Sequence, residues 1–339
     1  MKSIYPLAMV ALTAALAGCS SDDNDNPYVK GDTDVKIAFS NPFINNSVKE
    51  RTATPTSNEN LNEFRVWGFV VDPSSVVFDG NKVERAGDIW NVDRTEYWYA
   101  GQNYWFSAIA PYDNKTYSFE PVTTPAETYY GGGTLTFHND RANGETDLVY
   151  AFSGPIIHPD GATEFEPVAL TFNHMLSQLS FRFINSVSES TTLEVSNLRI
   201  TNVPSSGVID LNQNGTNRLW TIDSDNSFVL SGIDTEGRFG YSSPGNSIES
   251  EQVYIIPSNT AVKYQVAFDI DVYNGNNRMA TYSHTIELPA KTEFAIGQSY
   301  RFTATFTGDN VAPGGLKPIE FTVDKVNDWT MADGGEVSY

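Results

Sequence analysis

The residue best placed for chemistry in this chain is Cys19, the only cysteine among 339 residues. It follows Leu16–Gly18 at the end of a segment that starts with Lys2 and is apolar from residue 7 to residue 16. A basic start, a short apolar run and small residues before a cut are typical of a lipoprotein signal peptide, and the run is too short to span a bilayer. We therefore expect residues 1–18 to be removed and the Cys19 thiol to be acylated. The alternative is an ordinary secretory signal followed by a chance cysteine.

Acylation would place the mature chain on a membrane. Several hydrocarbon chains on one cysteine make the anchoring effectively permanent, since each buried methylene adds about 0.8 kcal/mol. Residues 19–34 are polar and acidic, which predicts a flexible tether. The acidic run directly behind Cys19 also resembles the surface-export signal of Bacteroidota lipoproteins, and this resemblance implies an outer-membrane protein that faces the medium. The aspartates of the tether lack the glycine turn and terminal glutamate of a calcium loop.

No other residue pattern in the chain indicates catalysis or a cofactor. The histidines, His138, His158, His174 and His284, are scattered without the spacing of metal or nucleophilic sites, and His174 is interpreted as a structural hydrogen-bonding residue. Gly131–Gly133 precedes a strand pattern, not a helix, so a phosphate site is not supported. Carboxylates are abundant, and a glycosidase needs only two of them, but none forms a recognisable pair. The sequence predicts no catalytic residue, no metal and no cofactor, and favours a protein that is not an enzyme.

The net charge of the chain argues against nucleic acids and anionic membrane surfaces as partners. The net charge is −21, and it becomes one unit more negative when Lys2 leaves with the signal. Nucleic acids and anionic membrane surfaces would repel such a chain. The mature chain has no second cysteine, so its stability must come from core packing rather than from disulfides.

Short strand patterns separated by Gly, Pro and Asn turns recur along the whole chain, and 13% of the residues are aromatic. In Tyr264–Val272 the apolar residues share one face, so Asp269 and Asp271 are expected on the solvent face. A short piece at Asn173–Leu179 is the best helical candidate. Many short strands without alternating helices predict an all-β fold of β-sandwiches. The proline-containing stretch Ser153–Pro167 places a domain boundary near residue 165. The expected strands are Val35–Phe39, Phe64–Val71, Tyr104–Ile109, Leu135–Phe137, Leu148–Phe152, Val168–Phe172, Leu179–Ile184, Leu193–Val203, Val253–Ile256, Tyr264–Val272, Ser283–Leu288, Tyr300–Phe306 and Ile319–Val323.

Several blocks of the sequence resemble one known family, and together they span nearly the whole mature chain. The blocks are Phe64–Val71 (FRVWGFVV), Trp98–Tyr112 (WYAGQNYWFSAIAPY), Val168–Phe181 (VALTFNHMLSQLSF), Gln252–Pro257 (QVYIIP), Pro289–Phe302 (PAKTEFAIGQSYRF) and the C-terminal strand Pro318–Trp329. They look like the fimbrillin family of Bacteroidota, the Mfa-like or FimA-type subunits of type V pili.

The resemblance implies a specific architecture and assembly. It implies two tandem transthyretin-like β-sandwich domains, here residues 35–165 and 166–339, with the short helical piece near the start of the second. It also implies export as a lipoprotein and assembly into a fimbria by strand exchange with other fimbrial subunits. In the family, an arginine-specific protease cuts behind the first strand and removes lipid and strand together, which opens a groove for a neighbour's strand.

The family's roles fall on a few residues of this sequence. Val35, Ile37 and Phe39, within 35–39, would be the first strand that is removed. Residues 40–60 would be the maturation loop, and Arg51 occupies the position of the cleavage arginine, although an exposed arginine in a loop is also ordinary. Ile319, Phe321 and Val323 alternate as a groove-filling donor strand should.

Besides an enzyme, which no residue pattern in the sequence requires, two readings of the function remain open. The first is a structural subunit of a cell-surface fimbria that supports adhesion. The alternative is a lipid-anchored monomeric adhesin or glycan-binding protein, in which Trp90, Trp98, Tyr99, Tyr104 and Trp105 would form an aromatic platform. Period-two alternation predicts that about half of those rings face the core, which favours the first reading. A stalk subunit would offer its C-terminal strand to a neighbour, an anchor would keep its lipid, and a tip subunit would keep that strand in its own sheet.

Overall fold

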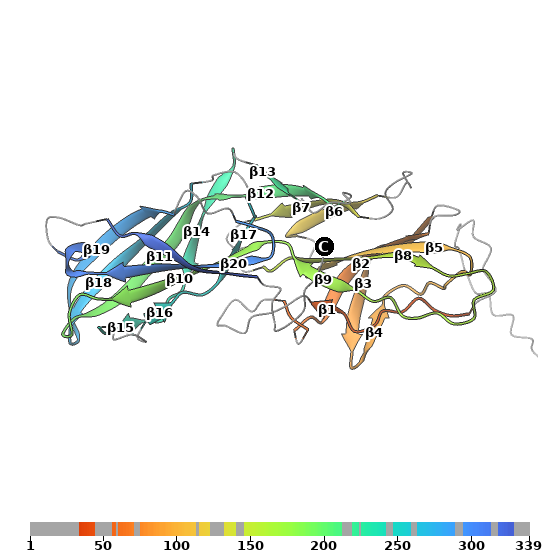
Figure 1. Ribbon diagram of the computed structural model, residues 1–339, viewed down its shortest axis with the longest axis horizontal. Helices are drawn as coiled ribbons and strands as arrows, with labels where there is room; N and C mark the ends of the chain where they lie inside the picture. The colour runs from red at the N-terminus through yellow and green to blue at the C-terminus, as the bar shows by residue number, and fades with distance from the viewer. Residues whose placement is uncertain are drawn as a thin grey trace, which may run out of the picture.

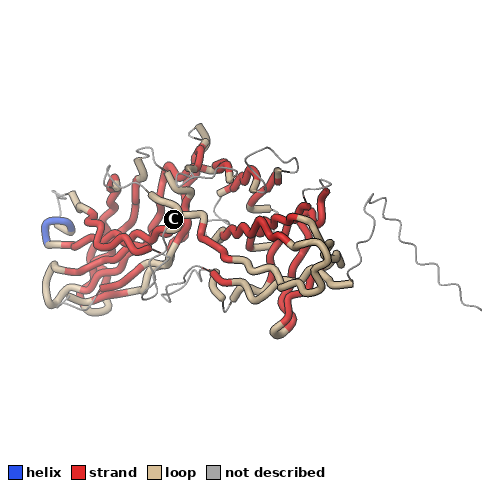
Figure 2. The backbone as a smooth tube through the Cα atoms, turned by 45° about the vertical axis from the view of Figure 1, so that its right-hand side comes forward, coloured by secondary structure: helices blue, strands red, loops and turns tan. Residues whose placement is uncertain are grey.

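The protein is an elongated all-β molecule with two lobes placed end to end (Figure 1). The computed structural model of the chain describes residues 34–44, 56–58, 60–70, 75–112, 115–122, 132–139, 146–211, 219–223, 225–241, 247–258, 263–288, 294–312 and 318–328. Strands dominate the backbone (Figure 2), and the 3-10 turn η2 (Gly308–Asn310) is the only helix in these ranges. None of the described elements is a helix long and apolar enough to cross a membrane. The all-β prediction is confirmed.

The first lobe is built on a seven-stranded sheet with the order β1-β9-β8-β5-β2-β3-β4. Its central strand β5 is buried on both faces: Tyr104 and Phe106 face one core, and Trp105 and Ile109 face another. Two cores on opposite faces explain why this strand is apolar almost throughout. The strands are β1 (Phe43–Ile44), β2 (Glu63–Val70), β3 (Ser75–Ala86), β4 (Ile89–Val92), β5 (Asn103–Ala110), β8 (Val149–Ile157) and β9 (Thr171–His174).

A four-stranded sheet covers the second of these cores. Its order is β13-β12-β7-β6, and β12 pairs with β7 through Ser206↔His138 to Asp210↔Thr134. Strands from both sides of residue 165 therefore share this sheet, as β8 and β9 share the larger one. The domain boundary near residue 165 stays a prediction. The strands are β6 (Tyr117–Pro121), β7 (Gly133–His138), β12 (Ser206–Asp210) and β13 (Trp220–Ile222).

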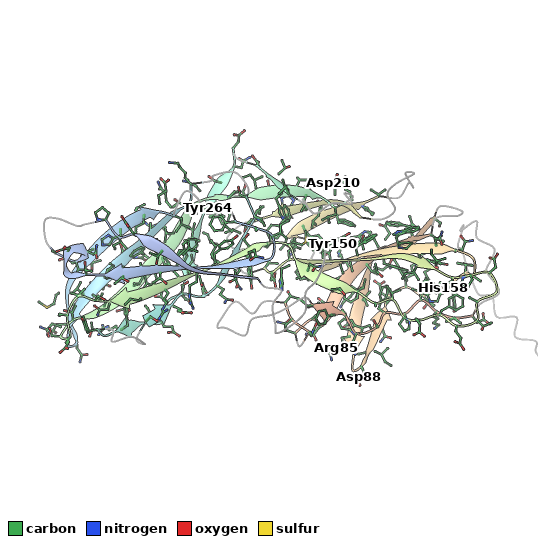
Figure 3. All side chains as sticks on the ribbon, in the orientation of Figure 1. Arg85, Asp88, Tyr150, His158, Asp210 and Tyr264 are labelled. Atoms are coloured by element: carbon green, nitrogen blue, oxygen red, sulfur yellow. The ribbon has the colours of Figure 1, made fainter. Side chains whose placement is uncertain are left out.

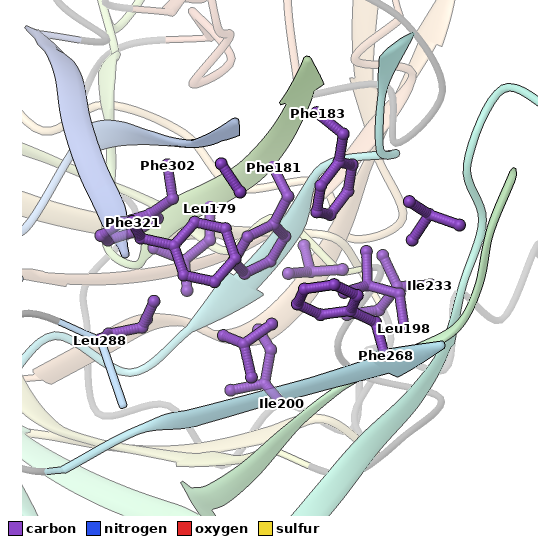
Figure 4. Packing of buried hydrophobic residues seen from close by; sticks show 14 of the residues in the cluster. Leu179, Phe181, Phe183, Leu198, Ile200, Ile233, Phe268, Leu288, Phe302 and Phe321 are labelled. Atoms are coloured by element: carbon purple, nitrogen blue, oxygen red, sulfur yellow. The ribbon is translucent and has the colours of Figure 1, made fainter. Parts of the chain in front are cut away.

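Two five-stranded sheets form the second lobe. One has the order β16-β10-β20-β21, with β17 also paired to β10, and the other has the order β14-β11-β18-β19, with β15 also paired to β11. Between them lies an aromatic core that includes Phe181, Phe183, Phe268, Phe302 and Phe321 (Figure 4). The strands are β10 (Ser177–Asn185), β11 (Thr192–Pro204), β14 (Ser227–Ile233), β15 (Arg238–Phe239), β16 (Ser247–Glu249), β17 (Val253–Ile255), β18 (Gln265–Asn274), β19 (Asn277–Glu287), β20 (Gln298–Phe306) and β21 (Phe321–Asp328).

The predicted helical piece at Asn173–Leu179 is wrong. The chain ends β9 at His174, turns through Met175 and Leu176, and begins β10 at Ser177. The first five residues of β10 are all buried, and the polar residues Ser177, Gln178 and Ser180 are among them, so this strand has no solvent-facing side there. A strand covered on both faces resembles a short helix in sequence, and the pattern alone cannot separate the two.

Candidate functional site

The candidate site is the place where residues 34–44, which we call the N-terminal segment, lie in the first lobe. The predicted first strand, Val35, Ile37 and Phe39, is part of this segment. Cys19 and Arg51 lie outside the described residues, as does most of the predicted maturation loop. The candidate donor residues Ile319, Phe321 and Val323 lie at the far end of the chain, in or beside β21.

The backbone of the N-terminal segment joins two strands that are distant in the sequence. On one side Ile37 N–H donates to the Glu96 carbonyl at 2.8 Å, and Phe39 forms a bridge with Trp90 of β4. On the other side Val168 N–H donates to the Ala38 carbonyl at 2.8 Å. Farther along, β1 pairs in parallel with β9. The segment therefore lies between the β4 edge and the β9 edge of the same curved sheet, and it satisfies backbone groups on both.

Three side chains of the segment enter the first core. Ile37, Phe39 and Ile44 are 5%, 4% and 2% exposed. The Phe39 ring lies 5.8 Å from the Phe106 ring and 6.0 Å from the Phe64 ring, in edge-on geometry with both. Burying each of these side chains contributes roughly 1.5–3 kcal/mol. The segment is thus a structural part of the core, although it is regular strand only at β1.

Asn41 and Pro42, two further residues of the segment, also contact the first lobe. The Trp90 indole Nε1 donates a hydrogen bond of 3.0 Å to Asn41 Oδ1, while Trp90 itself is 5% exposed. Pro42, the next residue, is buried. The pattern from Ile37 to Ile44 is therefore apolar, apolar, amide, proline and apolar at positions 37, 39, 41, 42 and 44.

The chain is tied down on both sides of the region that contains Arg51. Before it, Ile44 N–H donates to Asn58 Oδ1 at 2.6 Å. After it, Thr56 N–H donates to Asp147 Oδ2 at 2.7 Å. These bonds hold residues 44 and 56–58 on the first lobe.

Asp147 is the centre of a buried polar cluster that sequence reasoning missed. Its Oδ1 lies 3.0 Å from His174 Nδ1, and the two side chains are 2% and 0% exposed. Its negative charge, together with burial as the larger cause, raises the pKa of the Tyr254 hydroxyl. The structural hydrogen bond expected of His174 is confirmed. No local signal could have found its partner, since 27 residues separate His174 from Asp147 and 91 separate Thr56 from Asp147.

The candidate donor strand is folded into its own lobe. β21 pairs antiparallel with β20, and Ile319, Phe321 and Val323 are 4%, 5% and 36% exposed. The Phe321 ring packs 5.6 Å from the Phe181 ring. The register shifts where Val323 and Lys325 face Phe302 and Arg301, so Asp324 has no opposite residue in this sheet.

The proposed aromatic platform does not exist as a surface. Trp90, Trp98, Tyr104 and Trp105 are between 0% and 5% exposed, and Tyr99 is partly buried. More of these rings face the cores than alternation alone predicts, because both faces of β5 are covered. Within the described residues no three His, Cys, Asp or Glu side chains are arranged to hold a metal ion.

His158 makes the stability of the first lobe sensitive to pH. It lies at the outer end of this lobe (Figure 3), with its ring 4.6 Å from Trp98 and 4.5 Å from Phe165. Burial lowers the pKa of His158 below the usual 6.5. Below about pH 6.5 the unfolded chain takes up a proton that the folded chain resists, so the free energy of unfolding should fall as the pH falls. Urea unfolding at pH 7.5 and pH 5.5 should show this loss, and His158→Phe should reduce it. If His158→Phe loses as much free energy of unfolding between pH 7.5 and pH 5.5 as the native chain does, His158 is not the cause of the pH dependence.

Comparisons with known proteins give the same fold. A family model described as Fimbrillin-like matches residues 51–329. A fimbrial protein from Bacteroides vulgatus superposes with a TM-score of 0.59 at 15% identity, over 87% of this chain and 99% of that one. A proposed cell adhesion protein from Bacteroides uniformis superposes with a TM-score of 0.51 at 15% identity, over 88% of this chain and 99% of that one. No curated protein sequence matches the chain.

Proposed function

Because the chain belongs to the Fimbrillin-like family, we propose that it is the lipoprotein precursor of a fimbrial subunit whose N-terminal segment is exchanged for a strand of another subunit. Family membership makes it a fimbrial or cell-adhesion protein of the cell surface, a structural protein and not an enzyme. The proposal adds the route of assembly. Its parts are acylation at Cys19, outer-membrane export, cleavage after Arg51, and two transthyretin-like sandwich domains that divide near residue 165.

The observation that supports the proposal is that the N-terminal segment completes the first lobe. The segment supplies hydrogen bonds to the 96–98 and 168–170 backbones and fills the core with Ile37, Phe39 and Ile44. Its loss would leave two unpaired strand edges beside an apolar groove. Such a groove is completed by an added strand, whose main chain supplies affinity and whose alternate side chains supply specificity.

Cleavage alone would not empty this groove. Three buried side chains together contribute roughly 5–9 kcal/mol, so the cut segment remains bound until another strand replaces it. What the cut removes is the covalent link, and with it the high effective concentration of the resident strand. Exchange then follows mass action, and the lipid at Cys19 leaves with the displaced piece.

A second candidate function has its own observation. The C-terminal strand is paired with β20, and Phe321 is buried in the core of the second lobe. A subunit that keeps this strand accepts a neighbour's strand but offers none, as expected of a fimbrial tip. A lipid-anchored monomeric adhesin would also keep it.

Limited digestion with an arginine-specific protease tests the proposal. We expect a new N-terminus at Thr52 and, once a fimbrial subunit that supplies a compatible strand is added, a ladder of heat-resistant oligomers on a denaturing gel. Arg51→Lys is the matched control, because it keeps the charge but removes the protease's target. A new terminus at Thr52 without a ladder would favour the tip or the monomeric adhesin. Failure to cut at Arg51 in the folded protein would contradict the maturation site.

A further inference from the structure

The N-terminal segment and the C-terminal strand share an apolar pattern. Ile37 and Phe39 are followed by Ile44, and Ile319 and Phe321 are followed by Val326 at the same spacing. A strand from a second copy could therefore place Ile319, Phe321 and Val326 at the sites of Ile37, Phe39 and Ile44. The positions between them decide whether that strand fits.

We propose that the groove rejects the C-terminal strand of a second copy and selects a strand from a different subunit, which has an uncharged residue at the Pro42 site and a side-chain acceptor at the Asn41 site. This proposal rests on the strand exchange proposed above, and it names the chemistry of the partner strand.

The Pro42 site is the first cause of rejection. In the shared register Asp324 would occupy this buried site. Burying a carboxylate without a partner is strongly unfavourable.

Other registers do not remove the conflict. Only shifts by two residues keep the same side chains facing the core. A shift that places Ile319 at the Phe39 site brings Asp324 to the site of Ile44, which is 2% exposed. A shift that places Phe321 at the Ile37 site brings Asp328 to the Ile44 site. Each of the three registers puts a carboxylate at a buried position.

The Asn41 site is the second cause. In the shared register Val323 replaces Asn41, and valine offers no acceptor to the Trp90 indole N–H. A hydrogen bond of this kind is worth about 1 kcal/mol net. The favoured partner strand is therefore apolar at the 37, 39 and 44 sites, carries an amide, carboxylate or hydroxyl at the 41 site, and is uncharged at the 42 site.

Peptide competition on the full chain cut after Arg51 tests this selection. The labelled probe is a peptide of residues 34–45, and its uptake is followed by fluorescence anisotropy. Unlabelled competitors are the peptide of residues 317–328, its Asp324→Pro form and its Val323→Asn/Asp324→Pro form. The reciprocal control is the 34–45 peptide with Pro42→Asp. The same series on a Trp90→Phe chain isolates the contribution of the indole.

We expect the native 317–328 peptide to compete at least tenfold less well than the unlabelled 34–45 peptide. Asp324→Pro should recover about tenfold, equivalent to about 1.4 kcal/mol, and Pro42→Asp should lose a similar factor. Val323→Asn should add a further gain of about fivefold that disappears on the Trp90→Phe chain. Equal competition by the native 317–328 and 34–45 peptides would overturn the selection while leaving strand exchange intact. If the labelled 34–45 peptide does not enter the groove, strand exchange itself fails and the selection with it.

Discussion

Replacing Phe39 by alanine is expected to lower the free energy of unfolding of the first lobe by about 3–5 kcal/mol, the usual cost of removing a buried aromatic ring. The ring is 4% exposed and lies between Phe64 and Phe106, with Phe78 at 6.1 Å. Loss of the ring would leave a cavity inside the core. The N-terminal segment would not close over that cavity, because hydrogen bonds hold it to both neighbouring edges. Urea unfolding followed by tryptophan fluorescence measures the loss.

Phe43→Ala is the matched control for this prediction. It removes the same side chain four residues later in the same segment, but Phe43 is 55% exposed. Its effect should stay within about 0.5 kcal/mol. Similar losses for the two variants would mean that the N-terminal segment is not anchored by its inward-facing side chains, and the groove argument would fail. Phe39→Ala should also speed strand exchange in the cut protein, because the resident strand is held less tightly.

Replacing Asp147 by alanine is expected to lower the free energy of unfolding by about 3–5 kcal/mol, because breaking a buried pair leaves the remaining partner buried without its counterpart. The substitution would leave His174 and the Thr56 N–H without the carboxylate that each contacts. The side chains of Asp147 and His174 are almost wholly buried, so water cannot readily take the place of the carboxylate. Thermal and urea unfolding would measure the change.

Asp88→Ala controls for the loss of one negative charge. Asp88 lies at the exposed tip of the β3–β4 hairpin (Figure 3), so its removal should change stability by less than about 0.5 kcal/mol. A double-mutant cycle with His174→Ala should give a coupling energy above about 1 kcal/mol, as expected for groups in one buried network. Independent, additive effects would contradict the idea that Asp147 and His174 act as a unit to hold the chain beside the Arg51 region.

Strand patterns predicted much of the fold correctly and failed in two instructive places. Tyr264, Val266, Phe268 and Ile270 are all buried, as their period-two spacing indicates. Asp271 was expected on the solvent face, yet it is only 7% exposed, because Thr281 donates a hydrogen bond to it and Arg278 lies 3.5 Å away. The helical piece at Asn173–Leu179 failed because β10 is covered on both faces. Both errors come from neighbours that the local pattern does not contain.

The sequence by itself determined what depends on linear motifs and on short-range periodicity. The layout around Cys19 predicts lipidation, alternation predicts an all-β protein, and the quoted blocks resemble the family that the comparison identifies. Only the tertiary structure decided how the N-terminal segment is held, because its partners at Glu96 and Val168 lie about sixty and about one hundred and thirty residues away along the chain. The same holds for the Asp147–His174 pair and for the buried Pro42 site. Such contacts are set by how sheets close on each other, and residue spacing carries no information about that closure.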